Sequence, residues 1–346
     1  MAAADPSSRR GFASDNAAGV HPRVLEALAS ANVGHAVAYG DDDWTERAVA
    51  QIREVLAAPD AEVLLTVNGT GANVVGLASL LRPYESVLCT HLAHIAVDEC
   101  GAPTRFSGST LVPLASDDGL LDPVLVEAAM HGVGDQHHTQ PRVVSVSQST
   151  EVGTLWRPDR LRELADVVHE HGLLLHMDGA RLANAVAGLG GDVAGAVSGV
   201  DVLSFGFTKN GAMMGEAVVW LDPRLAEHAR YVRKQATQLA SKHRFVAAQV
   251  TALLSDGLWL DLAGHANAMA RLLADGVRDV VELSREPEAN AVFARLPDDA
   301  IEALRARWPF YVWDPSVGEV RWVAAWDVTE ADVDAFAADV RASVGA

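Results

Sequence analysis

The chain has little cysteine and no apolar leader segment. Of its 346 residues only Cys89 and Cys100 are cysteines, which is too few for a disulfide framework, and their spacing matches no metal-binding pattern. Residues 1–11 are small and polar and lack the apolar core of a signal peptide. No apolar run is long enough to cross a bilayer. We therefore expect a cytoplasmic protein whose two cysteines are reduced and structural.

Positive charge is also scarce. The 27 lysines and arginines face 46 aspartates and glutamates, so the formal net charge is −19. Such an acidic chain argues against nucleic acid and anionic membranes as partners. Apolar residues make up 49% of the sequence, which is enough for a sizeable core and argues against global disorder.

Short apolar runs alternate with helical segments along most of the chain. Near-continuous apolar strands separated by helices indicate an α/β fold with a mostly parallel sheet that is covered on both faces. The segments expected to be strands of this sheet are 62–67, 86–90, 105–113, 142–147, 173–177, 200–205 and 217–221.

From residue 223 the pattern becomes mainly helical, with a long amphipathic helix expected over 258–276. Later strands and helices alternate again, and Thr329 with Asp332 resembles a capping box. We therefore expect a mobile N-terminal tail over 1–10, a large domain over 11–244 that includes the N-terminal segment, and a smaller α+β C-terminal domain over 245–346.

Two chemically distinctive residues follow neighbouring strands. Asp178 lies at the end of one strand, in His176-Met177-Asp178-Gly179-Ala180-Arg181, and Lys209 follows the next strand. Ligand sites of such sheets lie beyond the carboxyl ends of the strands, so we expect both side chains at one edge. An acid and an amine placed in this way are what a pyridoxal phosphate enzyme needs. The lysine binds the cofactor's aldehyde, and the carboxylate keeps the pyridine nitrogen protonated.

An anion site is predicted after the first strand. Asn68-Gly69-Thr70-Gly71 separates that strand from an apolar helix. Backbone N–H groups and the helix dipole favour an anion there, and glycine allows a phosphate to approach closely. The segment is not a Walker sequence, because no Gly-Lys-Ser/Thr follows, so a single phosphate is the expected ligand.

Other candidates have a structural interpretation as well. His94 follows a strand, and a lone histidine in that position is more often structural than catalytic. Ser14 and Asp15 suit a turn that leads into a helix, and Arg321 suits a surface position on a strand. The pair His137-His138 predicts a solvated loop, since adjacent side chains point apart and no third ligand is evident, so no metal site is expected.

These residues together resemble a known family. Asp178-Gly179-Ala180-Arg181-Leu182, the turn with Lys209, Gly69-Thr70 and His94-Ile95 are similar to the L-threonine aldolase branch of the β-eliminating lyases, which are fold-type I pyridoxal phosphate enzymes. The resemblance covers about residues 11–340. The segments 204–216 and 241–245 are most similar to bacterial low-specificity L-threonine or phenylserine aldolases.

The resemblance implies roles for residues that would contact the cofactor. Lys209 would bind the cofactor's aldehyde, Asp178 would pair with the pyridine nitrogen, and Arg181 would lie near the ring hydroxyl. Gly69-Thr70 would hold the phosphate. His94 would stack on the ring, close to the substrate's β-hydroxyl group.

The resemblance also implies substrate and subunit contacts. Ser14 and Arg321 would bind the substrate carboxylate. Arg244 would reach a phosphate of its own or a neighbouring subunit. Family members form active sites between the subunits of a homotetramer, so Tyr39 would be contributed across an interface.

One segment departs from the family pattern. Many threonine aldolases carry Asn-Thr-His after the strand that here ends at Ser147, whereas this chain has Gln148-Ser149-Thr150-Glu151. A histidine proposed to act on the β-hydroxyl group is therefore missing. The base is then expected to be His94, or a water held by neighbouring polar groups.

The expected activity is reversible cleavage of L-threonine, L-allo-threonine or a related β-hydroxy-α-amino acid, including L-phenylserine, to glycine and an aldehyde. The alternatives are another fold-type I enzyme, either a β-eliminating lyase or an aminotransferase, and a non-catalytic binding module that retains the fold.

Overall fold

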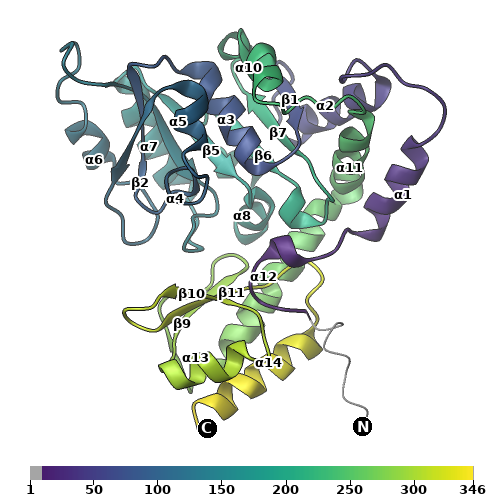
Figure 1. The fold of residues 1–346 in the computed structure, drawn as a ribbon, viewed down its shortest axis with the longest axis vertical. Coiled ribbons are helices and arrows are strands. Elements are labelled where there is room, and N and C mark those ends of the chain that lie inside the picture. Colours follow the sequence, from purple (N-terminus) through teal and green to yellow (C-terminus); the bar gives the residue numbers. More distant parts are fainter. Residues whose placement is uncertain (1–9, 346) are drawn as a thin grey trace.

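A seven-stranded sheet lies at the centre of the larger part of the molecule (Figure 1). The structure is a computed structural model and describes residues 10–345. The strands lie in the order β1-β7-β6-β5-β4-β2-β3, and β7 alone runs antiparallel to its neighbours in this sheet. The predicted mostly parallel sheet is therefore confirmed. The strands are β1 Glu62–Thr66, β2 Glu85–Thr90, β3 Thr110–Leu114, β4 Gln140–Ser147, β5 Leu174–Gly179, β6 Val202–Gly206 and β7 Glu216–Trp220.

Helices cover both faces of this sheet. Successive residues of a strand point to opposite faces, so Val202 packs in the core that includes α3, whereas Leu203 packs in the core that includes α7 and α11. The helices are α1 Pro22–Ala31, α2 Asp43–Val55, α3 Gly69–Leu80, α4 His94–Val97, α5 Ala102–Ser107, α6 Pro123–Ala128, α7 Pro158–Glu170, α8 Leu182–Gly188, α9 Val193–Ala196, α10 Ala229–Gln235, α11 Arg244–Leu254, α12 Leu258–Val277, α13 Asp298–Arg305 and α14 Glu330–Ser343.

The central strands are buried on both faces. Every residue of β6 and β7 is buried, as is β5 beyond its first residue. Such strands read as apolar runs because neither face contacts water. Asp178 on β5 and Glu216 on β7 are the acidic exceptions. Burying a charge is costly unless it is paired, so these two positions mark a site rather than a core.

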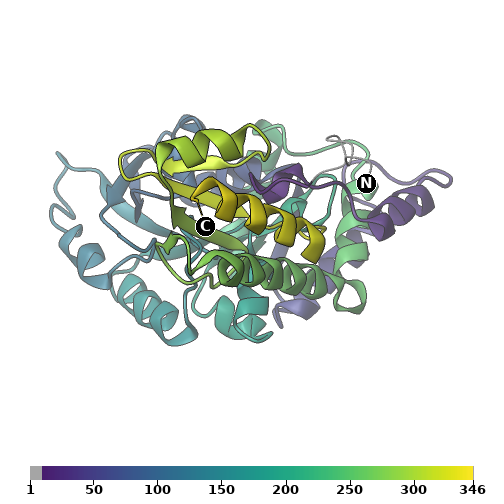
Figure 2. The same cartoon turned by 90° about the horizontal axis from the view of Figure 1, so that it is seen from below.

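A second, antiparallel sheet forms the smaller part of the molecule, in the order β10-β11-β9-β8. Its strands are β8 Glu282–Leu283, β9 Ala291–Arg295, β10 Tyr311–Asp314 and β11 Glu319–Val323. Viewed from below in Figure 2, α13 and α14 lie with this sheet and α12 runs beside α14. The predicted capping box starts α14, since Asp332 N donates to Thr329 Oγ1 and Thr329 N donates to Asp332 Oδ2.

The N-terminal segment is attached to this smaller part. Phe12 stacks on Phe336 with ring centroids 4.5 Å apart, and its backbone N–H donates to Pro309 O. Val323 N in turn donates to Phe12 O. These contacts hold residues 14–16 between the two sheets. The predicted mobile tail over 1–10 lies outside the described residues except for Arg10, which pairs with Asp327 and Asp332.

One predicted strand is wrong over most of its length. The segment 105–113 was expected to be extended, but α5 continues to Ser107 and β3 begins only at Thr110. Pro103 in the first turn of α5 has a backbone angle suited to a helix start. Gly108 ends the helix in the left-handed conformation at φ 74°. The apolar residues after this glycine alone form the strand.

The chain passes from the core of the large sheet to the core of the small sheet along α12. Residues from Val246 to Ala263 pack in the core of the large sheet, and residues from Met269 onward pack with the small sheet. The domain boundary near residue 245 stays a prediction. The stretch Arg244–Val277 is long and apolar enough to cross a membrane by length and composition alone, but 56% of the apolar 18-residue window within it is buried inside the protein. Its packing in both cores accounts for its apolar character.

Candidate active site

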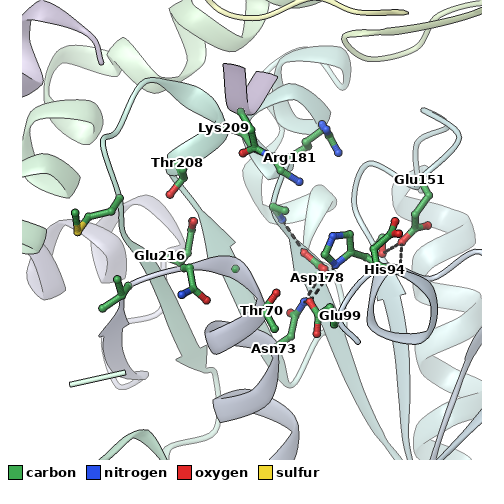
Figure 3. A pocket seen from close by; sticks show the side chains of 18 of the residues that line it. Thr70, Asn73, His94, Glu99, Glu151, Asp178, Arg181, Thr208, Lys209 and Glu216 are labelled. Carbon is green, nitrogen blue, oxygen red and sulfur yellow. Dashed lines mark hydrogen bonds and ion pairs between the residues drawn. The ribbon is translucent and has the colours of Figure 1, made fainter. Parts of the chain in front are cut away.

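A cavity of about 560 Å³ lies at the carboxyl ends of the parallel strands (Figure 3). Its walls come from the ends of β4 and β5, the turn after β6, and the starts of α3 and α4. A volume of this size suits a small-molecule ligand. The fold brings together six of the residues predicted to form a site: Gly69, Thr70, His94, Asp178, Arg181 and Lys209.

Asp178 lies near the end of β5 and is held in a defined orientation. Asn73 Nδ2 donates to its Oδ2 at 2.7 Å, and Ala180 N donates to its Oδ1 at 3.0 Å. The side chain is buried, with 7% exposure of the residue. A buried carboxyl group with two donors is held in one orientation at the cavity wall.

Lys209 lies in the short 3₁₀ turn Thr208–Asn210 that follows β6. Burial lowers the pKa of its ammonium group, and the nearby Arg181 guanidinium lowers it further, whereas Asp15 and Asp178 act in the opposite direction. A lowered pKa increases the fraction of neutral amine at a given pH. The side chain is therefore prepared to act as a nucleophile toward a carbonyl carbon.

The start of α3 forms the opposite wall. Asn68 caps this helix, with its Oδ1 accepting from Gly71 N at 2.8 Å. The first N–H groups of a helix have no partner within the helix, and the helix dipole adds positive potential at the same end. Gly69 and Thr70 line the cavity at this point, so an anion is accommodated there.

His94 begins α4 and is oriented by Glu99. Its Nδ1 lies 3.0 Å from Glu99 Oε1, and this hydrogen bond is the main reason why the pKa of His94 is raised. We assign the proton to Nδ1 from this geometry, since a carboxylate oxygen accepts. Burial raises the pKa of Glu99. The pair therefore holds a proton at the cavity wall beside Asp178.

Asn73 links this pair to Asp178. Its Nδ2 donates to Glu99 Oε1 at 2.9 Å as well as to Asp178. Ligand atoms of His94, Glu99 and Asp178 lie within 4.8 Å of one another, close enough to bind a metal ion. The shared amide group and the histidine hydrogen bond already account for this close approach.

Arg181 pairs with the N-terminal segment. Its Nε and Nη2 donate to the two oxygens of Asp15 at 2.7 and 2.8 Å. Asn290 Nδ2 also donates to Asp15, at 3.1 Å. Bidentate arginine–carboxylate pairs are strong and directional. The pair joins the large sheet to the smaller part of the molecule at the edge of the cavity.

Four predicted residues do not line this cavity. Ser14 caps a turn by accepting from Asn16 N. The guanidinium of Arg321 lies over the rings of Trp313 and Tyr311, at 4.8 and 5.7 Å. Tyr39 is half-exposed, with Lys234 Nζ 4.9 Å from its ring centroid.

Arg244 is the fourth of these residues. Its Nη1 donates to the carbonyl oxygens of Val33 and Gly34. The roles of Ser14, Arg321, Tyr39 and Arg244 stay predictions.

Glu216 is an acid of the cavity wall that the motifs did not indicate. It starts β7, is 5% exposed, and its Oε2 accepts from Phe207 N at 2.6 Å. Burial raises the pKa of this carboxyl group to about 7. Glu216 therefore anchors the turn that carries Lys209. Its carboxyl group keeps its proton below neutral pH.

We expect Glu216→Gln to stabilise the protein at alkaline pH. The ordinary pKa of a glutamate side chain is 4.5, and that of folded Glu216 is about 7. Between these two values the folded state binds more protons than the unfolded state, so stability falls as pH rises across this range. Glutamine keeps an oxygen for Phe207 N but cannot ionise. Urea unfolding at pH 8 should show the variant on the order of 3 kcal/mol more stable, with the difference absent near pH 4.5. Equal stability at pH 8 would contradict this expectation.

Sequence reasoning missed the residues that support the motifs. Asp15, Asn73, Glu99 and Glu216 each contact a predicted site residue or its turn. The one available signal was a charged residue beside an apolar run, which applies to Glu216 at the start of β7. For Asp15 and Asn73 the sequence offers no signal.

The chain is similar to known proteins over almost its whole length. The family described as β-eliminating lyase matches residues 11–298. The low specificity L-threonine aldolase of Pseudomonas sp. (strain NCIMB 10558) is 46% identical over 341 residues, covering 97% of this chain and 98% of the relative. That of Pseudomonas aeruginosa is 47% identical over 343 residues, with the same coverage. The structure of Leishmania major threonine aldolase matches with a TM-score of 0.92 at 32% identity, covering 96% of this chain and 99% of that one.

Proposed function

The chain belongs to the β-eliminating lyase family, and on that premise we propose that it acts as a pyridoxal phosphate-dependent aldolase. As a carbon–carbon lyase of low specificity it cleaves L-threonine, L-allo-threonine or related β-hydroxy-α-amino acids, including L-phenylserine, to glycine and an aldehyde, reversibly. The observation that carries the proposal is that Asp178, Lys209 and Gly69-Thr70 line a single cavity.

The residues present fit the cofactor. Pyridoxal phosphate has three separate requirements, which are an amine with a lowered pKa, a fixed carboxylate and a helix start that lines the cavity, and this site has all three. Lys209 would bind the aldehyde carbon, Asp178 would hold the proton of the pyridine nitrogen, and Gly69-Thr70 would hold the phosphate. Arg181 would lie near the ring hydroxyl and His94 against the ring face.

The protein's own residues then act on the substrate. When bound, pyridoxal phosphate supplies an electron-accepting ring that stabilises negative charge at the α-carbon of an amino acid. Asp178 would hold the proton of the pyridine nitrogen, and with it the positive charge that makes the ring electron-accepting. Lys209 Nζ lines the same cavity and would return a proton to the α-carbon of the substrate.

The substrate carboxylate is assigned to Arg321, with Ser14 as a second contact. The aromatic rings beside Arg321 fix the plane of its guanidinium, and its Nε is buried without a partner among the described residues. A forked pair of donors orients a carboxylate, and with it the bond to be broken.

Arg321→Ala is expected to raise the KM for L-threonine about 10- to 100-fold, because a charge-assisted hydrogen-bonded pair contributes roughly 1.5–3 kcal/mol. Steady-state kinetics measure the effect. Arg295→Ala serves as the control, since Arg295 lies on the adjacent strand and pairs with Glu282 at the surface. A KM unchanged by Arg321→Ala would remove this residue from the site.

We further propose a cytoplasmic homotetramer in which Tyr39 and Arg244 reach a neighbouring subunit's site. Their positions away from the cavity of their own chain are compatible with this arrangement. Light scattering of the purified protein measures the assembly directly.

A product assay tests the activity. The holoenzyme is incubated separately with L-threonine, L-allo-threonine and L-phenylserine, and glycine, aldehyde, ammonia and keto acid are measured. Glycine and the matching aldehyde are expected in equal amounts. Ammonia with a keto acid would instead indicate elimination or transamination and would overturn the proposal.

A further inference from the structure

The side chain of Glu151 lies in the cavity wall beside His94 (Figure 3). Glu151 belongs to the turn after β4, and Ser147 and Ser149 of the same segment also line the cavity. It is the last residue of the stretch in which this chain departs from the pattern of many threonine aldolases. A carboxyl group of this altered segment therefore lies in the wall of the ligand cavity.

One oxygen of Glu151 is committed to structure. His94 N donates to Oε1 at 2.9 Å, and Ser147 Oγ donates to the same atom at 2.6 Å. Within residues 10–345, these two are the donors from other residues that reach Glu151, and neither engages Oε2. A carboxyl group that lines the ligand cavity and is held by its neighbours through one oxygen has the arrangement of a positioned base.

His94 is the competing candidate, since the hydrogen bond from Nδ1 to Glu99 leaves its Nε2 as an acceptor. Its Nδ1 is occupied by Glu99, and its backbone N–H is held by Glu151. Both contacts fix the imidazole in place, which suits a group that packs against a flat ring. Glu151 accepts from the backbone N–H of His94 through Oε1, and no donor from another described residue is recorded at its Oε2.

We propose that Glu151 is the general base that takes the proton of the substrate's β-hydroxyl group. This rests on the aldolase function proposed above. The hydroxyl proton passes to Glu151 Oε2, and the electron pair of the O–H bond becomes the second bond of the aldehyde carbonyl. The Cα–Cβ bond breaks, and its electron pair stays with the α-carbon. Lys209 Nζ then returns a proton to that carbon, and Glu151 releases its own proton to water as the aldehyde leaves.

The surroundings of Glu151 favour this role. Burial raises the pKa of its carboxyl group, which makes the carboxylate a stronger base than an exposed one. The titratable groups around it are Asp178, Arg181, Cys89 and His94. Asp178 acts in the same direction as burial, whereas the two hydrogen bonds to Oε1 keep the ionised form accessible.

The Glu151→Gln variant removes the proposed base but keeps the structural contacts of the side chain. The amide oxygen of glutamine can still accept from His94 N and Ser147 Oγ, but the side chain can no longer take a proton. In the holoenzyme we expect kcat for cleavage of L-threonine to fall by about 10²–10⁴-fold. The cofactor absorbance should remain, and so should exchange of the glycine α-proton with deuterated water, since that exchange uses Lys209 and Asp178 but no β-hydroxyl group. Glu151→Asp, which keeps a carboxylate, should retain more cleavage than Glu151→Gln.

Two results would overturn the proposal. Cleavage by Glu151→Gln within tenfold of the unmodified enzyme would assign the proton to His94 or to water. Equal losses of cleavage and glycine exchange would show that Glu151 acts only by positioning its neighbours. A different result, glycine exchange by the unmodified enzyme without cleavage of any β-hydroxy-α-amino acid, would instead contradict the proposed aldolase function.

Discussion

Lys209→Ala is expected to abolish both the visible absorbance of bound pyridoxal phosphate and the formation of glycine from L-threonine. Lys209 is the one lysine among the cavity-lining residues, and burial with the neighbouring Arg181 lowers the pKa of its amine. An alanine can neither bind the cofactor's aldehyde nor return a proton to the α-carbon. Glycine formation should therefore fall to the level of the uncatalysed reaction.

Absorbance spectra and a glycine assay measure these two effects. Lys209→Arg keeps a positive charge but forms no exchangeable bond with the aldehyde, so it should be equally inactive. The chain contains only three lysines, Lys209, Lys234 and Lys242. Borohydride reduction followed by peptide mass analysis should therefore place the cofactor on Lys209 without ambiguity. A Lys209→Ala enzyme with normal turnover would refute the proposed function.

Asp178→Ala is expected to have the second-largest effect, a loss of about 10²–10³-fold in kcat. Removing a preorganised electrostatic group from an active site has an effect of this size. The carboxylate is held by Asn73 and Ala180 N–H groups. Its removal also leaves the amide of Asn73 with one carboxylate partner, Glu99, in place of two. The ring would then lose the charge that makes it electron-accepting.

The matched control for this variant is Glu163→Ala. Glu163 lies on α7 with 62% of its side chain exposed, and it pairs with the exposed Arg160. Surface pairs of this kind contribute little to stability, so activity should be unchanged. Asp178→Asn, which keeps the shape and loses the charge, should be nearly as impaired as Asp178→Ala. An Asp178→Asn enzyme of normal activity would show that the charge is not required.

Much of the fold follows from local pattern. The strands of the large sheet read as apolar runs because they are buried on both faces, and the motifs at their ends share an edge because parallel strands end on the same side. The strand predicted over 105–113 was wrong because the pattern of apolar residues did not distinguish a short helix that Pro103 starts and Gly108 ends.

The supporting groups of the site were beyond such reasoning. Asn73 and Asp178 are 105 positions apart in the chain, and Asp15 and Arg181 are 166 apart. Nothing in a local pattern connects residues so distant, since their contact depends on how α3 and the N-terminal segment pack. Asp15 in particular reaches Arg181 because Phe12 is fixed in the core of the smaller sheet.

The sequence by itself determined which chemical groups are present and at which strand ends they lie, because strand period and turn residues are local properties. It identified Asp178, Lys209 and the anion turn at Gly69-Thr70, and it singled out the altered segment that ends at Glu151. Only the tertiary structure decided how these groups are held and charged. Burial raises the pKa of Glu151, Glu99 and Glu216 and lowers that of Lys209. Burial depends on the packing of the whole chain, and so do the hydrogen bonds that His94 N and Ser147 Oγ donate to Glu151 Oε1.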